Sequence, residues 1–281
     1  MNKLIAGTVA ALWLGCGAAL AADMNGPAAG AAPSKQDYNW TGAYVGLHVG
    51  GGWQSTSFAD PGATSIMFNC CFLIGNVNTP GPIPDGSASS VLGGVQAGWM
   101  YQIARLVIGA EFDWSATRLK SAGAASFTPI VAGNLSTDAY SERTDWIATS
   151  TATVGIARDN WLLFTKAGAA FAEDKYAVNI AGSGTFFGPV IPFSFSSTAN
   201  KIVPGWTAGG GVRYALGQNL LVSAEYDYIY FGSRTPNLSG AFSATPTGVG
   251  TAATFTPNFT QGISEVKLGI DYKFAPGLLF W

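Results

Sequence analysis

Charged side chains are scarce in this sequence. They make up 11% of the 281 residues, against 48% hydrophobic residues, whereas a soluble domain carries about 25% charged residues. Long apolar runs are missing too: after residue 22 no stretch reaches the roughly 18 residues of a membrane-spanning helix. A chain this hydrophobic without a spanning helix points to a closed β-barrel, because only helices and closed barrels satisfy every backbone group in lipid.

Histidine and cysteine are rare too, which limits the chemistry of the chain. His48 is the only histidine, and Cys70 and Cys71 are adjacent, so the ligands of a tetrahedral metal site cannot be assembled. We interpret the cysteine pair as an incidental feature of a loop, and the alternatives are a bridge to another chain or a strained disulfide between the two neighbours. No hydroxyl stands two residues from His48 on the same face, so the sequence offers no base with a positioned nucleophile. We expect no catalytic residues, no metal and no cofactor, and therefore a protein that is not an enzyme.

The first 22 residues have the features of a secretory signal peptide. Lys3 supplies the positive charge, an apolar core follows, and small residues at the end provide a cleavage site. Residues 23–39 are rich in Ala, Pro, Gly and Ser and are predicted to form a flexible periplasmic tail. Residues 40–281 are predicted to form one outer-membrane barrel domain.

The stretch Ile263–Phe274 shows the alternation on which the fold assignment rests. Successive side chains of a strand point to opposite faces. One face here carries large apolar residues, namely Val266, Leu268, Ile270, Tyr272 and Phe274. The other carries small or charged residues, namely Lys267, Gly269, Asp271 and Lys273. In a membrane barrel the apolar face contacts lipid and the charged face lines a polar interior.

Eight such strands can be placed along the chain. They are predicted at about residues 40–53, 89–101, 106–117, 142–157, 161–173, 201–215, 220–232 and 263–274. Short connections at 102–105, 158–160 and 216–219 alternate with long ones near 55–88, 118–141, 174–200 and 233–260. This alternation is typical of a bacterial outer-membrane barrel. The predicted fold is all-β: an eight-stranded antiparallel transmembrane β-barrel with four long outer loops and three short periplasmic turns, in the cell outer membrane.

Tryptophans gather at the predicted strand ends. At the periplasmic ends these are Trp40, Trp99 and Trp161, and at the outer ends Trp53, Trp114, Trp146 and Trp206. Rings with one apolar and one polar end are favoured at membrane–water interfaces. We therefore predict two aromatic belts.

The inward-facing phase of the strands collects charges of both signs. The predicted interior ion-pair network comprises Glu111, Asp113, Lys166, Arg213, Glu225, Asp227, Lys267 and Asp271. His48 and Lys273 share this phase. Buried charges must be paired, and an eight-stranded barrel is just wide enough for side chains to fill it. A closed network is expected, and the alternative is a narrow conduction path lined by charge.

Two stretches resemble a known family. Asn39-Trp40-Thr41-Gly42-Ala43-Tyr44-Val45-Gly46, followed by Gly50-Gly51, resembles the opening strand of the alphaproteobacterial outer-membrane immunogenic proteins. These are the porin-like β-barrels of Brucella, Bartonella and rhizobia, eight-stranded barrels of the OmpA type. Val266–Phe274 is similar to their closing strand. The resemblance implies a major surface antigen with a structural role in a Gram-negative envelope and, in some relatives, host-cell or hemin interaction. Family members usually end at the strand-final Phe, so either Trp281 replaces it here or insertion tolerates the extension.

Three functions remain open. The favoured one is a structural outer-membrane β-barrel that displays surface loops and whose interior is filled by side chains. The alternatives are a small passive diffusion channel and a loop-mediated surface binder, either an adhesin or a receptor for hemin or another small ligand. Expected partners are outer-membrane lipid and lipopolysaccharide, the outer-membrane insertion machinery, and a host or small-molecule ligand at the outer loops. No nucleic-acid partner is expected, because a net charge of −2 offers no basic patch for its phosphates.

Overall fold

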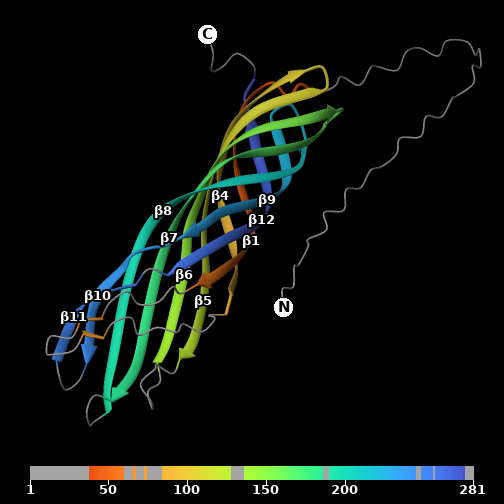
Figure 1. Ribbon diagram of the computed structural model, residues 1–281. Helices are drawn as coiled ribbons and strands as arrows, with labels where there is room; N and C mark the ends of the chain where they lie inside the picture. The colour runs from red at the N-terminus through yellow and green to blue at the C-terminus, as the bar shows by residue number, and fades with distance from the viewer. Residues whose placement is uncertain are drawn as a thin grey trace, which may run out of the picture. The chain divides into compact units, whose positions relative to one another are not determined.

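The computed structural model describes residues 38–59, 66–67, 73–74, 84–127, 136–185, 190–244, 248–255 and 257–275, all within the compact unit Gln36–Trp281. The strands, shown in Figure 1, are β1 Gly42–Ala59, β2 Ile66–Met67, β3 Leu73–Ile74, β4 Gly86–Ile103, β5 Leu106–Phe127, β6 Ser136–Arg158, β7 Trp161–Thr185, β8 Val190–Ala215, β9 Leu220–Arg234, β10 Leu238–Ala244, β11 Gly248–Phe255 and β12 Asn258–Lys273. The predicted signal peptide, most of the predicted tail, Cys70, Cys71 and Trp281 lie outside the described residues.

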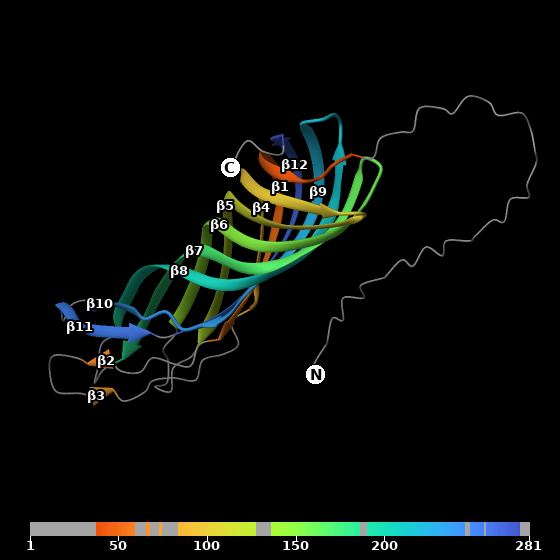
Figure 2. The same cartoon turned by 90° about the horizontal axis from the view of Figure 1, so that it is seen from above.

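Eight long strands form a closed antiparallel ring. Their order around it is β8-β7-β6-β5-β4-β1-β12-β9, and β9 pairs with β8 to complete it. The first strand, β1, therefore lies between β4 and the last strand, β12. This pairing confirms the predicted eight-stranded antiparallel barrel. The short strands β10, β11, β2 and β3 continue the sheet from β8 (Figure 2).

The three short connections lie where the sequence predicts them. Ala104-Arg105 joins β4 to β5, Asp159-Asn160 joins β6 to β7, and residues 216–219 join β8 to β9. Ala104 and Asp159 have φ angles of 55° and 51°, in the left-handed region that two-residue hairpin turns use.

The strands β5 to β8 run further than predicted. They contain 22 to 26 residues each, so the segments 118–141 and 174–200, predicted as loops, are largely strand (Figure 1). Tyr176, Val178 and Ile180 are buried while their neighbours are not, so the period of two continues past residue 173. The Gly, Ser and Thr residues of these segments pair as strand because each has a partner strand beside it.

The outward face of the ring is apolar and the inward face is polar. On β12, Leu268 is 60% exposed, whereas its neighbour Lys267 is 2% exposed. Apolar residues are exposed on every ring strand, among them Leu47, Val91, Ile108, Ile156, Leu163, Val212, Tyr226 and Ile270. A water-soluble barrel would bury this face, and a barrel in lipid exposes it. No helix in the described part of the chain has the length and apolarity to cross a membrane.

Candidate functional site

Lys166 on β7 is buried in the interior, where it contacts three carboxylates. Its Nζ is 3.0 Å from Glu111 Oε1, 2.6 Å from Glu225 Oε2 and 3.2 Å from Asp227 Oδ2. All four side chains are buried. Because the carboxylates come from β5 and β9, one ammonium group links three strands across the interior.

Arg213 on β8 forms a second junction beside it. The Nη2 atom is 2.9 Å from Glu111 Oε2 and 3.3 Å from Glu225 Oε1, and Nε is 3.5 Å from Asp271 Oδ2. The guanidinium carbon lies 4.5 Å from the ring centroid of Tyr44, a cation–π contact. Tyr44 also donates a 2.6 Å hydrogen bond to Glu111. The planar guanidinium thus binds carboxylates at its edge and a ring on its face.

Lys267 on β12 joins the remaining carboxylates. Its Nζ is 2.8 Å from Asp113 Oδ2 and 2.9 Å from Asp227 Oδ2, so Asp227 bridges Lys166 and Lys267. The structure therefore brings all the residues of the predicted interior network together: Glu111, Asp113, Lys166, Arg213, Glu225, Asp227, Lys267 and Asp271.

Glycines on neighbouring strands make room for these side chains. Gly209 is paired with Asp227, and Gly46 with Asp271. A Cβ atom at either glycine would overlap the Oδ1 atom of its partner carboxylate. Glycine is therefore required where a charged side chain folds over the neighbouring strand.

Carboxyl groups outnumber the cations in this interior. Glu265 on β12 has the same phase as Lys267, yet the sequence analysis did not include it. It is 1% exposed, and its Oε1 has no hydrogen-bond partner among the described residues. Three cations thus face six inward carboxyls: Glu111, Asp113, Glu225, Asp227, Glu265 and Asp271. Where the chain is described, no group of three or more His, Cys, Asp or Glu side chains is suited to hold a metal ion.

His48 makes contacts that the sequence did not predict. Its Nε2 is 2.8 Å from Ser115 Oγ, and its Nδ1 is 3.1 Å from Gln96 Oε1 and 3.6 Å from Asp113 Oδ2. The strand register brings the Ser115 hydroxyl from β5, so His48 has a hydroxyl partner that its own strand does not supply and that the sequence analysis did not name. Hydroxyl, imidazole and carboxylate are the groups of an acyl-transfer triad. Here all are buried, and Ser115 donates to the same Asp113, so the arrangement is an enclosed hydrogen-bond network.

An apolar layer separates this network from the outer end of the barrel. It consists of Leu119, Ile147, Ala170, Ala172, Val203, Ile229, Phe231 and Ile263. These side chains come from β5, β6, β7, β8, β9 and β12. These buried side chains form one apolar cluster near the level of the outer tryptophans.

A second buried polar cluster lies beyond that layer. Arg234 on β9 forms an ion pair with Asp174 and lies 4.0 Å from Glu142 Oε1. Glu142 Oε2 accepts hydrogen bonds from Gln54 Nε2 at 3.1 Å and Thr56 Oγ1 at 2.9 Å. Glu142 lies on β6 beyond Trp146, outside the membrane-spanning part of the strand. Burial, reinforced by the Asp174 carboxylate and opposed by Arg234, raises the pKa of Glu142 to about 7.

We expect the substitution Glu142→Gln to remove a pH dependence of stability. The pKa of Glu142 in the folded state lies above its ordinary value of 4.5. The protonated carboxyl therefore contributes fully to the free energy of unfolding below pH 4.5, and this contribution is lost as the pH rises through about 7. Near pH 8 the variant should be more stable than the parent by about 3 kcal/mol, and near pH 4 the two should agree. Urea unfolding in detergent micelles measures the stability of the variant and of the parent at each pH. An equal difference at the two pH values would contradict the prediction.

Trp40 closes the periplasmic end of the interior, which corrects its predicted place in an aromatic belt. It is 0% exposed and its ring centroid lies 4.9 Å from that of Tyr38. It precedes β1, so strand alternation does not direct its side chain outward. Lys273 lies at the same end, outside the ion-pair network, with Nζ 4.7 Å from the Tyr38 ring. The other predicted belt residues are exposed or half-buried on the outward face: Trp53, Trp99, Trp114, Trp146, Trp161 and Trp206.

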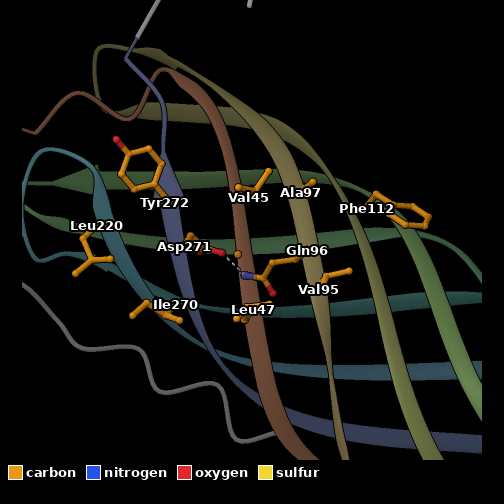
Figure 3. A pocket seen from close by; sticks show the side chains of 11 residues that line it. Val45, Leu47, Val95, Gln96, Ala97, Phe112, Leu220, Ile270, Asp271 and Tyr272 are labelled. Atoms are coloured by element: carbon orange, nitrogen blue, oxygen red, sulfur yellow. Dashed lines mark hydrogen bonds between the residues drawn. The ribbon is translucent and has the colours of Figure 1, made fainter. Parts of the chain in front are cut away.

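A shallow apolar groove of 590 Å³ crosses the outward face of β12, β1 and β4 (Figure 3). Outward side chains such as Val45, Leu47 and Ile270 line it. At its floor, Gln96 Nε2 donates a 2.6 Å hydrogen bond to Asp271 Oδ1. The groove therefore offers an apolar surface to a lipid chain and contains few polar groups for any other ligand.

Comparisons with known proteins place these features in context. The model of a family described as outer membrane protein beta-barrel domain matches residues 18–274. The chain is 27% identical to the 31 kDa outer-membrane immunogenic protein of Brucella melitensis, over 98% of this chain and 100% of that protein. It is 23% identical to the 25 kDa outer-membrane immunogenic protein of Brucella abortus, over 84% and 80%. Among solved structures, the outer membrane protein OprG of Pseudomonas aeruginosa has a TM-score of 0.37 and 10% identity, over 84% and 98%.

Proposed function

Since the chain belongs to the outer membrane protein beta-barrel family, we propose that it is a structural protein of the cell outer membrane, with a closed interior and with outer strands and loops displayed at the surface. One observation carries this proposal. The cations Lys166, Arg213 and Lys267 bind carboxylates from several strands across the interior, and every member of the network is buried. Buried charges held in this way fill space that a channel would leave to water.

The layers on either side of the network support the same function. Towards the periplasm, Trp40, Met100, Leu162 and Leu221 are buried in one apolar cluster. Towards the outside, the ring of Phe259 contacts Phe58, Tyr140 and Tyr176. An ion crossing the barrel would have to displace apolar side chains at both levels, which the closely packed interior of a folded domain resists.

The refolded protein is expected to show no steady large conductance in planar lipid bilayers. The baseline should match that of a bilayer treated with detergent alone. Insertion is checked on the same preparation by heat-modifiable migration on a gel, which reports the folded barrel. A stable open channel in bilayers that contain the folded form would contradict the closed interior and favour the passive diffusion channel.

A further inference from the structure

Four cations lie on the outward face of β5, β6 and β7. Lys120, Arg143 and Lys175 are direct cross-strand neighbours in that order. Arg118 stands two residues before Lys120 on β5, and all four side chains are exposed or half-buried. We call Arg118, Lys120, Arg143 and Lys175 the cation row. The strand register places Lys120, Arg143 and Lys175 side by side, and Arg118 extends the row along β5.

The cation row lies just beyond the outer tryptophans. Arg118 follows Trp114 by four residues on β5, which is about 13 Å along a strand and about 10 Å along the axis of a barrel whose strands tilt by about 40°. Trp146 marks the same boundary on β6, three residues from Arg143. The outer tryptophans mark the membrane interface, so the row is at the level of the lipid headgroups. Below it, Phe112 and Phe171 expose apolar surface to lipid chains.

The charge at this level is unevenly distributed around the ring. Asp145 lies 2.7 Å from Arg143 Nε and 2.6 Å from Lys175 Nζ, so a single carboxylate holds two cations. Among the described residues, Arg118 and Lys120 have no ion-pair partner. On β4, β1 and β12, which follow β5 around the ring, the outward residues just beyond the tryptophans are uncharged: Ser55, Ser57, Ser87 and Thr260. Even with Asp145 and Glu173 counted, the row keeps an excess of positive charge, which the net charge of the whole chain conceals.

We propose that the cation row binds the phosphate groups of a phosphorylated lipid of the outer leaflet, the lipid A part of lipopolysaccharide. This inference rests on the proposed location and orientation of the barrel. Arginine binds phosphate through paired N–H groups and lysine as a point charge, and both are present on adjacent strands. The acyl chains of the same molecule lie against the apolar strand surface beneath the row. Free phosphate shares the headgroup contacts but lacks those chains.

The test measures binding of lipid A by the refolded full chain in detergent micelles. Bisphosphorylated lipid A is titrated into the parent, into Arg118→Gln/Lys120→Gln, and into the matched control Arg105→Gln/Arg158→Gln, which removes two exposed cations at the periplasmic end. We expect Arg118→Gln/Lys120→Gln to bind lipid A at least about tenfold more weakly than the parent. Each basic residue near an anionic lipid surface strengthens binding several-fold, and this variant lacks two of them. The control should bind as the parent does.

Three results would overturn the proposal. They are unchanged affinity in Arg118→Gln/Lys120→Gln, equal affinity of the parent for lipid A stripped of its phosphates, and displacement by inorganic phosphate at the concentration of the lipid. If that variant does not fold, Lys175→Gln replaces it. The affinity of the parent must also fall as salt is raised, because salt screens exposed charges. A conducting barrel that still binds lipid A would refute the closed interior while leaving this inference intact.

Discussion

Replacing Lys166 with methionine is expected to lower the free energy of unfolding by about 3–5 kcal/mol, the effect of removing one partner from a buried ion pair. The ammonium group is within 3.2 Å of three buried carboxylates. Methionine matches its length but leaves Glu111, Glu225 and Asp227 with fewer compensating charges. The measurement is equilibrium unfolding by urea in detergent micelles, followed by gel migration without heating.

Two further variants separate charge from packing. Lys120→Met removes an exposed cation from β5 and should change stability by less than about 0.5 kcal/mol. Adding Glu225→Gln to Lys166→Met removes one uncompensated carboxylate and should restore part of the loss, which a double-mutant cycle quantifies. A Lys166→Met protein as stable as the parent would show that the network does not hold the interior together.

Trp40→Ala should be as damaging as Lys166→Met, with a loss of about 3–5 kcal/mol. The ring is completely buried and packs on Tyr38 at the periplasmic end, so alanine leaves a cavity in the closing cluster. The matched control is Trp161→Ala, which removes a tryptophan at the same end that is 55% exposed on the outward face.

The control should lose about 1 kcal/mol, because an exposed ring forfeits less burial. Both variants are followed by urea unfolding in the same micelles. A larger loss for Trp161→Ala than for Trp40→Ala would place Trp40 back in an aromatic belt and contradict its role in closing the barrel.

Alternation was sufficient to predict the ring and the inward charges from the sequence. A period of two assigns each residue to a face without knowledge of its partners, and this placed Lys166, Arg213 and Lys267 inside together. It also applied to Glu265, which shares the phase of Lys267. Glu265 is buried as this phase requires, so alternation alone is sufficient to place it inside as well.

Alternation does not predict strand register or strand length. Ser115 and His48 are 67 residues apart, and only the relative shift of β1, β4 and β5 brings them into contact. The continuation of β7 to Thr185 depends on pairing with β6 and β8, because small residues gain strand stability from their neighbours. The predicted place of Trp40 in an aromatic belt differs from the observed one for a related reason. Trp40 precedes the first strand, so strand alternation does not determine which way its side chain points.

The union of β1 with β12 has a consequence for how the barrel is made. Tyr44 and Lys273 are direct partners at opposite ends of the described chain, so the cylinder cannot be sealed before β12 has been synthesised. Until then β1 presents one free edge, which in any sheet invites pairing with other chains. Contacts between such distant residues also form slowly. A polypeptide that lacks β12 therefore needs protection from aggregation, and a copy truncated before β12 would retain that exposed edge permanently.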